Sequence, residues 1–245
     1  MPKLSPAKQP SENSVHQIRL ETSSIAISLQ VTAVFLTLVS WAAQWLRYAG
    51  GVENAYGLIP VMDVDREFSV PTVYSVLLLF TAALLLAFIA VFKIRAKAPF
   101  RWHWVILSLG FFFMAFDEGA SMHELLTDPL KGALSSDLPG FLSFSWVLIG
   151  GLVALLAGLF FVRFVLSLPG RTRNRFILSG ALYLSGAILM EMVGGNFADL
   201  NGIKNLGYNS LVTLEEFLEM TGSVCFIYTL LNTLREDLPV IHFQF

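Results

Sequence analysis

Residues 72–93 read TVYSVLLLFTAALLLAFIAVFK, a run in which the first charged side chain is Lys93, at its end. A bilayer core about 30 Å thick is crossed by roughly 20 apolar residues in an α-helix. The run is therefore predicted to be a membrane-spanning helix.

Five other stretches have a similar length and apolar character. Together they predict six spans, at about 25–46, 72–93, 104–123, 144–167, 176–195 and 211–233. Only 14% of the 245 residues are charged, against about 25% in soluble domains. We therefore expect an all-α integral membrane protein with a six-helix transmembrane domain over residues 23–235. Residues 1–22, which are polar and rich in Pro, Ser and Lys, are expected to form a disordered tail, and residues 236–245 a second tail.

Lysine and arginine predict the orientation, because they gather in cytoplasmic loops. One side of the six predicted spans holds twelve of them: Lys3, Lys8, Arg19, Lys93, Arg95, Lys97, Arg101, Arg163, Arg171, Arg173, Arg175 and Arg235. The other side holds four: Arg47, Arg66, Lys131 and Lys204. Both termini are therefore predicted to be cytoplasmic. The net charge of −2 gives no indication of a nucleic-acid partner, and the lipid bilayer is the expected partner.

Small residues recur on the fourth predicted span, where Gly150, Ala154 and Gly158 are spaced by four. Such a stripe permits close approach of two helices. The alternative is that Gly and Ala are simply common in membrane helices.

Six carboxyl groups are predicted to lie at membrane depth, near the outer ends of three spans. They are Asp117 and Glu118 in the third span, Glu191 in the last outer turn or two of the fifth, and Glu215, Glu216 and Glu219 in the sixth. An ionisable residue inside the membrane costs about 2.5–3.5 kcal/mol on insertion scales and usually marks a functional site. No Lys or Arg is predicted at the same depth, so cations, protons or water must compensate the charge.

A divalent metal is the first interpretation of these acids. Its predicted ligands are Asp117, Glu191, Glu215, Glu216 and Glu219, and Glu118 or His123 would act as the catalytic base. One imidazole with several carboxylates suits Fe, Mn or Zn, whereas an all-oxygen subset suits Ca²⁺ or Mg²⁺. A protonated, water-filled acidic cavity and structural hydrogen bonding between helices are the alternatives.

The position of His123 depends on where the third helix ends. In a regular helix, Asp117, Ser121 and Glu124 share one face and His123 points away from it. His123 joins the acids only if the helix ends or bends near Gly119. The sequence leaves both arrangements open.

The first outer loop carries three alternating acids, Asp63, Asp65 and Glu67. They form either a solvated acidic loop or a lid over the acidic site.

Three stretches carry a resemblance to a known family. They read MDVDREFSVPTVYSVLLLF (62–80), AFDEGASMHE (115–124) and TLEEFLEM (213–220). In this order the chain resembles, over roughly residues 55–232, a family of uncharacterised multi-pass bacterial inner-membrane proteins with no established activity. The resemblance implies that Asp63, Asp65 and Glu67 belong with the later acids. An inner-membrane location is expected for such a protein, and the lysine and arginine distribution predicts that the acidic site faces the periplasmic or extracellular side.

Three functions fit this arrangement. The first is a metal-dependent enzyme that acts at the outer leaflet on a lipid or other apolar substrate. The second is a cation or proton transporter that uses the same acids, and the third is a non-catalytic metal-binding sensor or assembly partner. Because the inner halves of the spans carry almost no polar residues, the sequence favours an enzyme or a binding protein over a transporter.

Overall fold

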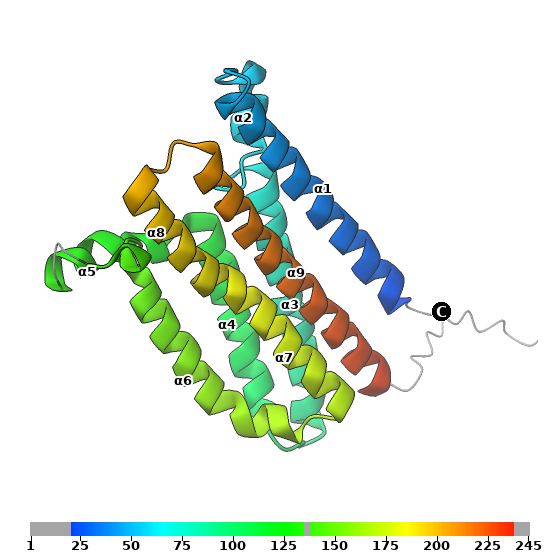
Figure 1. Cartoon of the computed structure of the whole chain (residues 1–245). Helices are drawn as coiled ribbons and strands as arrows, with labels where there is room; N and C mark the ends of the chain where they lie inside the picture. The colour runs from blue at the N-terminus through cyan, green and yellow to red at the C-terminus, as the bar shows by residue number, and fades with distance from the viewer. Residues whose placement is uncertain (1–20, 135–137, 238–245) are drawn as a thin grey trace, which may run out of the picture.

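The computed structural model describes residues 21–134 and 138–237, and these residues form helices joined by loops, with no strand among them (Figure 1). The prediction of an all-α chain is confirmed over this part. The predicted tails, 1–22 and 236–245, lie almost entirely outside the described residues.

The long helices are α1 (Thr22–Tyr48), α3 (Val70–Arg95), α4 (Arg101–Ala120), α6 (Trp146–Ser167), α7 (Gly170–Leu184), α8 (Glu191–Asn201) and α9 (Leu206–Asp237). A π-helical segment, Ser185–Met190, joins α7 to α8. The shorter elements are α2 (Leu58–Val61), α5 (Thr127–Leu134) and three 3₁₀ turns, Ala55–Gly57, His123–Leu126 and Gly140–Leu142.

Five helical units are long and apolar enough to cross a membrane: α1, α3, α6, the unit Gly170–Asn201, and α9 up to Glu236. A sixth is obtained when α4 is counted together with the helix His123–Leu134, which is bent away from it by 79°. The third predicted span is thus the exception among the six, because its helix breaks before residue 123.

Helix α3 shows why the quoted apolar run begins and ends where it does. The Ser69 side chain caps the helix by accepting a hydrogen bond from the Thr72 backbone N–H at 3.2 Å, and Pro71 lies in the first turn. Both are residues that helix starts favour. Lys93 and Arg95 occupy the last turn, where cations offset the negative end of the helix dipole.

Helix α9 is the central helix of the bundle. It packs against α1, α3 and α7, and 56% of its apolar stretch is buried, against 11% for α6. The main apolar core lies towards the ends of the helices remote from α2 and α5. Its largest members include Leu86, Trp104, Phe164, Phe176 and Leu230. This core fills the half of the bundle that the topology prediction assigns to the cytoplasmic side.

Two glycines allow α9 to approach the α7–α8 unit closely. A Cβ on Gly222 would lie 2.6 Å from the Tyr183 backbone nitrogen, and a Cβ on Gly186 would lie 2.7 Å from the Glu215 carbonyl oxygen. At Gly158, by contrast, an added Cβ would have no neighbour within 4 Å. Close helix approach therefore occurs at Gly186 and Gly222, and not at the Gly158 end of the predicted small-residue stripe.

The middle of α6 stands away from the rest of the bundle (Figure 1). Residues 155–160 are all exposed, and six consecutive residues pass more than once around a helix. Only Val147 near one end of α6 and Phe164 near the other are buried. Helix α6 is therefore held mainly at its two ends.

Candidate functional site

The end of α4 brings Asp117 and His123 together. Ser121 adopts a left-handed conformation with φ 42°, which ends the helix and turns the chain back. The His123 backbone N–H then donates to Asp117 Oδ1 at 2.9 Å, and His123 Nδ1 lies 2.8 Å from Asp117 Oδ2. Of the two arrangements that the sequence left open, the structure has the one in which the helix ends and His123 joins Asp117. The predicted shared face of Asp117, Ser121 and Glu124 is wrong for the same reason.

Trp146, the first residue of α6, links His123 to Glu191. Its indole Nε1 donates to Glu191 Oε1 at 2.8 Å, and its ring lies 4.4 Å from the His123 ring, centroid to centroid. One side chain thus contacts groups from two other elements. The start of α6 therefore sets the distance between the histidine and this acid.

Glu191 lies next to Glu215 across the contact between α8 and α9. The two carboxyl groups interact electrostatically. Glu191 directly follows the π-helical segment, a type of helix defect that is often found at functional sites. The structure thus brings carboxyl groups of two helices together directly after this defect.

Glu191 lies deeper than the sequence predicted. We expected it in the last outer turn or two of its helix, but α8 continues for ten residues beyond it, to Asn201. At 1.5 Å per residue, about 15 Å of helix separates Glu191 from the end. The connection to α9 is correspondingly short, and it covers residues 202–205 only.

Glu118, Glu216 and Glu219 form the deeper part of the site. Glu216 interacts electrostatically with both of the others, and its Oε2 is buried with no hydrogen-bond partner among the described residues. Tyr183 of α7 lies beside Glu219 and interacts with it electrostatically. Ser75 of α3 lies beside Glu118. The acids of α4 and α9 therefore face one another between α3 and α7.

The loop with Asp63, Asp65 and Glu67 is fixed against the bundle. Val64 is buried in a small apolar cluster with Tyr208 and Val212, and its backbone N–H donates to Ser40 Oγ at 3.1 Å. Asp63 Oδ2 lies 4.0 Å from the Arg47 guanidinium. The loop is thus docked on α1 and α9, at the end of the bundle where α2 lies (Figure 1).

Asp65 connects this loop to the other acids. Desolvation by the surrounding protein, followed by the negative charges of Asp63, Glu124 and Glu191, raises the pKa of Asp65 from 3.8 to about 7, although part of the Asp65 side chain is exposed to solvent, which weakens the effect of desolvation. Glu67 interacts electrostatically with Glu124, which is itself exposed. The three loop acids therefore differ: Asp65 lies near the site, Asp63 is paired with Arg47, and Glu67 lies near the exposed Glu124.

Sequence reasoning missed Trp146, Tyr183 and Ser75. None of the three had a usable signal, since one side chain in an apolar helix does not show which neighbour it will meet. For Tyr183, the π-helical segment between it and Glu191 also disrupts the regular helical spacing.

The predicted metal ligands do not form a preformed metal centre. Within residues 21–134 and 138–237, no group of three or more His, Cys, Asp or Glu side chains is arranged to hold a metal ion. Both oxygens of Asp117 accept from His123, and one oxygen of Glu191 accepts from Trp146. Metal binding stays a prediction, and it would require these side chains to rearrange.

Comparison with known proteins gives one match. Residues 30–234 match the model of a family described as a domain of unknown function, DUF8692. No curated protein and no solved structure matches the chain.

Proposed function

We propose, for a chain that belongs to the DUF8692 family, that the acidic site is the acid–base centre of a membrane-embedded enzyme. Its substrate is a lipid or another apolar molecule of the outer leaflet. His123 acts as the general base, held by Asp117, and a carboxyl group of the Glu191–Glu215 pair acts as the general acid.

The contact between Asp117 and His123 is the observation that carries this proposal. A carboxylate that accepts from Nδ1–H fixes the tautomer of an imidazole and leaves Nε2 free to take a proton. Among the described residues, Nε2 of His123 has no hydrogen-bond partner. Trp146 packs on the ring and limits its rotation. The imidazole is thus oriented on one side and open on the other, as a general base requires.

The neighbouring carboxyl pair supplies the complementary acid. A proton held between Glu191 and Glu215 is available for donation to a leaving group. Glu118 interacts electrostatically with both Asp117 and His123, and in this proposal its charge stabilises the imidazolium that forms when His123 takes up a proton.

The surroundings of the site support an apolar substrate. Phe112, Phe113 and Phe116 of α4 are exposed within the turn and a half before Asp117. In a membrane these side chains face lipid, so a substrate with an acyl chain reaches the site laterally. The lysine and arginine distribution supports the outer leaflet as its source.

A divalent metal is the second candidate chemistry, favoured by one specific observation. Glu216 interacts electrostatically with Glu118, Glu191 and Glu219, and its buried Oε2 is left without a partner among the described residues. Fe, Mn or Zn would suit His123 with these acids, and Ca²⁺ or Mg²⁺ would suit the acids alone. The metal candidate and the acid–base candidate differ in measurable metal content.

Transport is less well supported than an enzyme. Below the acids, the main apolar core closes the bundle with Leu86, Trp104, Phe164 and Phe176. An ion that entered from the acidic end would meet this core before it reached the opposite side. The acids therefore support a one-sided site.

Reconstitution tests the proposal. Purified protein is placed in vesicles of a bacterial lipid extract, and the lipids are followed by mass spectrometry over time. We expect conversion of at least one lipid by the wild type and by Asp128→Asn, a control that removes an exposed acid of α5. Loss of the base in His123→Asn should slow the conversion by about 10²–10⁴-fold, and Glu191→Gln should slow it as well.

Two outcomes would count against the enzyme. No change in any lipid with the wild type would reject it for this class of substrate. A cation or proton flux into the same vesicles that is driven by acid and abolished by Glu191→Gln would show that the protein is a transporter and not this enzyme.

A further inference from the structure

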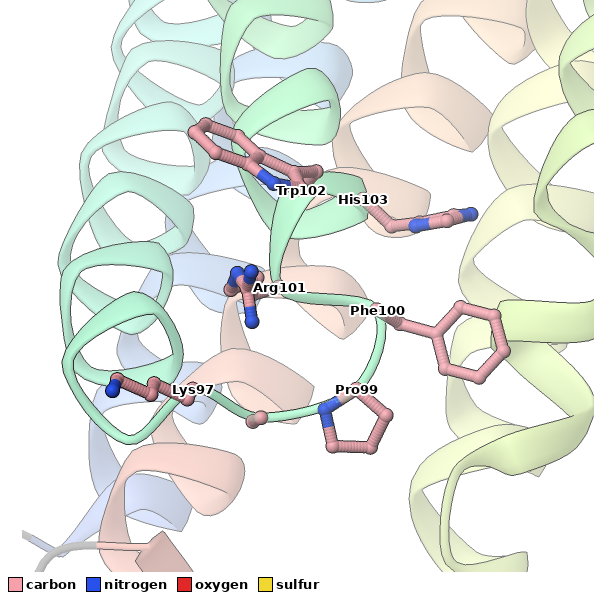
Figure 2. A pocket seen from close by; sticks show the side chains of 7 residues that line it. Lys97, Pro99, Phe100, Arg101, Trp102 and His103 are labelled. Atoms are coloured by element: carbon pink, nitrogen blue, oxygen red, sulfur yellow. The ribbon is translucent and has the colours of Figure 1, made fainter.

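The loop between α3 and α4 forms a hollow at the end of the bundle opposite the acidic site (Figure 2). Its volume is about 450 Å³, and residues 97–103 line it. Because the loop joins two apolar helices, a membrane places this hollow at the level of the lipid headgroups. It is therefore separate from the acids, which lie towards the other ends of the helices.

Two cationic side chains and a tryptophan surround the hollow. Lys97, Arg101 and Trp102 all lie along it (Figure 2). The Trp102 side chain is 60% exposed, and tryptophan favours the membrane–water interface. Among the described residues, neither Lys97 nor Arg101 has an ion-pair partner. Their charges are thus available to an external anion.

The loop backbone holds these side chains in a defined arrangement. Lys97 and Phe100 both have left-handed conformations, with φ 49° and 57°, and such strain at non-glycine residues is often found at ligand sites. The Ala98 N–H donates to the Lys93 carbonyl at 2.9 Å. The Phe100 ring packs against Phe164 of the main core. The loop is therefore anchored rather than free.

The start of α4 adds to the attraction for an anion. Its first turn contains no acidic residue, and no side chain caps it. Free backbone N–H groups at a helix start favour negative charge, here in addition to two cationic side chains.

We propose that this hollow binds the headgroup of an anionic phospholipid, with its phosphate between Lys97 and Arg101 and its glycerol region against Trp102. The lysine and arginine distribution places the loop in the cytoplasmic leaflet, whose surface is negatively charged. This proposal does not depend on the acid–base function.

Lipid binding to the full-length protein in detergent tests it. Native mass spectrometry gives the dissociation constant of the first bound phosphatidylglycerol, with phosphatidylcholine for comparison. A Lys or Arg near an anionic surface is worth about 1 kcal/mol, so Lys97→Gln with Arg101→Gln should weaken phosphatidylglycerol binding about 30-fold. The matched control, Arg171→Gln with Arg173→Gln at the start of α7, removes two charges on the same side and should change binding less than about threefold.

Three outcomes would overturn the proposal. One is equal weakening in both double variants, which would indicate diffuse charge attraction. Another is equal affinity of the wild type for the two lipids. The third is displacement of phosphatidylglycerol by inorganic phosphate at an equal concentration, which would identify a soluble phosphate as the ligand. Lys97 lies at the surface, so its replacement should leave the protein folded. Melting temperatures measured without added lipid check this for each variant.

Discussion

Replacement of Gly222 by alanine is the sharpest test of the packing that positions the acids. The added Cβ would lie 2.6 Å from the Tyr183 backbone nitrogen and 2.9 Å from the Ser179 carbonyl oxygen. Both are backbone atoms that no rotamer change can remove. An ordinary contact requires about 3.4 Å, so α7 and α9 must separate by roughly 0.8 Å.

The expected loss in the free energy of unfolding follows from this displacement. Overpacking of this kind destabilises proteins by about 1–3 kcal/mol, and each kcal/mol lowers the melting temperature by about 2–4 °C at this chain length. Gly222→Ala should therefore lower it by roughly 2–12 °C. Because Glu219 lies one turn earlier on α9 and faces Tyr183, the same shift should also reduce any activity that depends on the acids.

Gly158→Ala on α6 is the matched control. Its Cβ would meet nothing within 4 Å, and alanine favours helix over glycine by up to about 1 kcal/mol. Thermal unfolding in detergent, followed by the loss of the monodisperse peak in size-exclusion chromatography, compares the two variants. Two results would contradict the predicted overlap: a melting temperature of Gly222→Ala equal to that of the wild type, or a loss of stability in Gly158→Ala as large as that in Gly222→Ala.

Three other predictions concern the site itself. Trp146→Phe keeps an aromatic ring on His123 but removes the hydrogen bond to Glu191. It should lower the free energy of unfolding, measured by thermal unfolding, by about 1 kcal/mol. An unchanged melting temperature would show that the bond contributes nothing to stability. Neighbouring protein and the charges of nearby acids raise the pKa of Asp65 above its value in the unfolded chain, so the folded protein binds this proton more tightly. Because the Asp65 side chain is also exposed to solvent, screening makes the stabilisation small. The stabilisation is present below about pH 4 and is lost as the pH rises through about 7, so between about pH 5 and pH 8 the wild type should lose slightly more stability than Asp65→Asn, and a larger loss in Asp65→Asn would contradict this reasoning. Mass-spectrometric metal analysis of protein purified without chelators should find less than one equivalent; one or two equivalents of Fe, Mn or Zn, lost on Glu→Gln at Glu215, Glu216 and Glu219, would establish the metal candidate instead.

The long apolar helices could be predicted from the sequence because their signal is local. An apolar run such as 72–93 is long enough to cross a membrane, where a helix satisfies all its backbone polar groups internally. The depth of Glu191 could not be predicted in the same way. Residues 196–201, with Asn196 and Asp199 among them, resemble a loop in composition, yet they continue the helix and leave only a short connection to α9.

The meeting of Asp117 and His123 depended on one backbone angle. The sequence does not indicate that the backbone of Ser121 adopts a left-handed conformation, since serine adopts many conformations in turns. The contacts of Trp146 depended instead on tertiary packing between α6, α8 and the turn after α4. Sequence patterns describe one helix at a time, and such contacts between three elements lie beyond them.

The exposed middle of helix α6 leads us to expect a mechanical effect of lipid on the site. In a bilayer, a helix held mainly at its two ends would take its tilt from the thickness of the surrounding lipid as well as from the protein. The first residue of this helix is Trp146, which touches both His123 and Glu191. The spacing of those two groups would therefore be expected to change with bilayer thickness, without any ligand binding to the site.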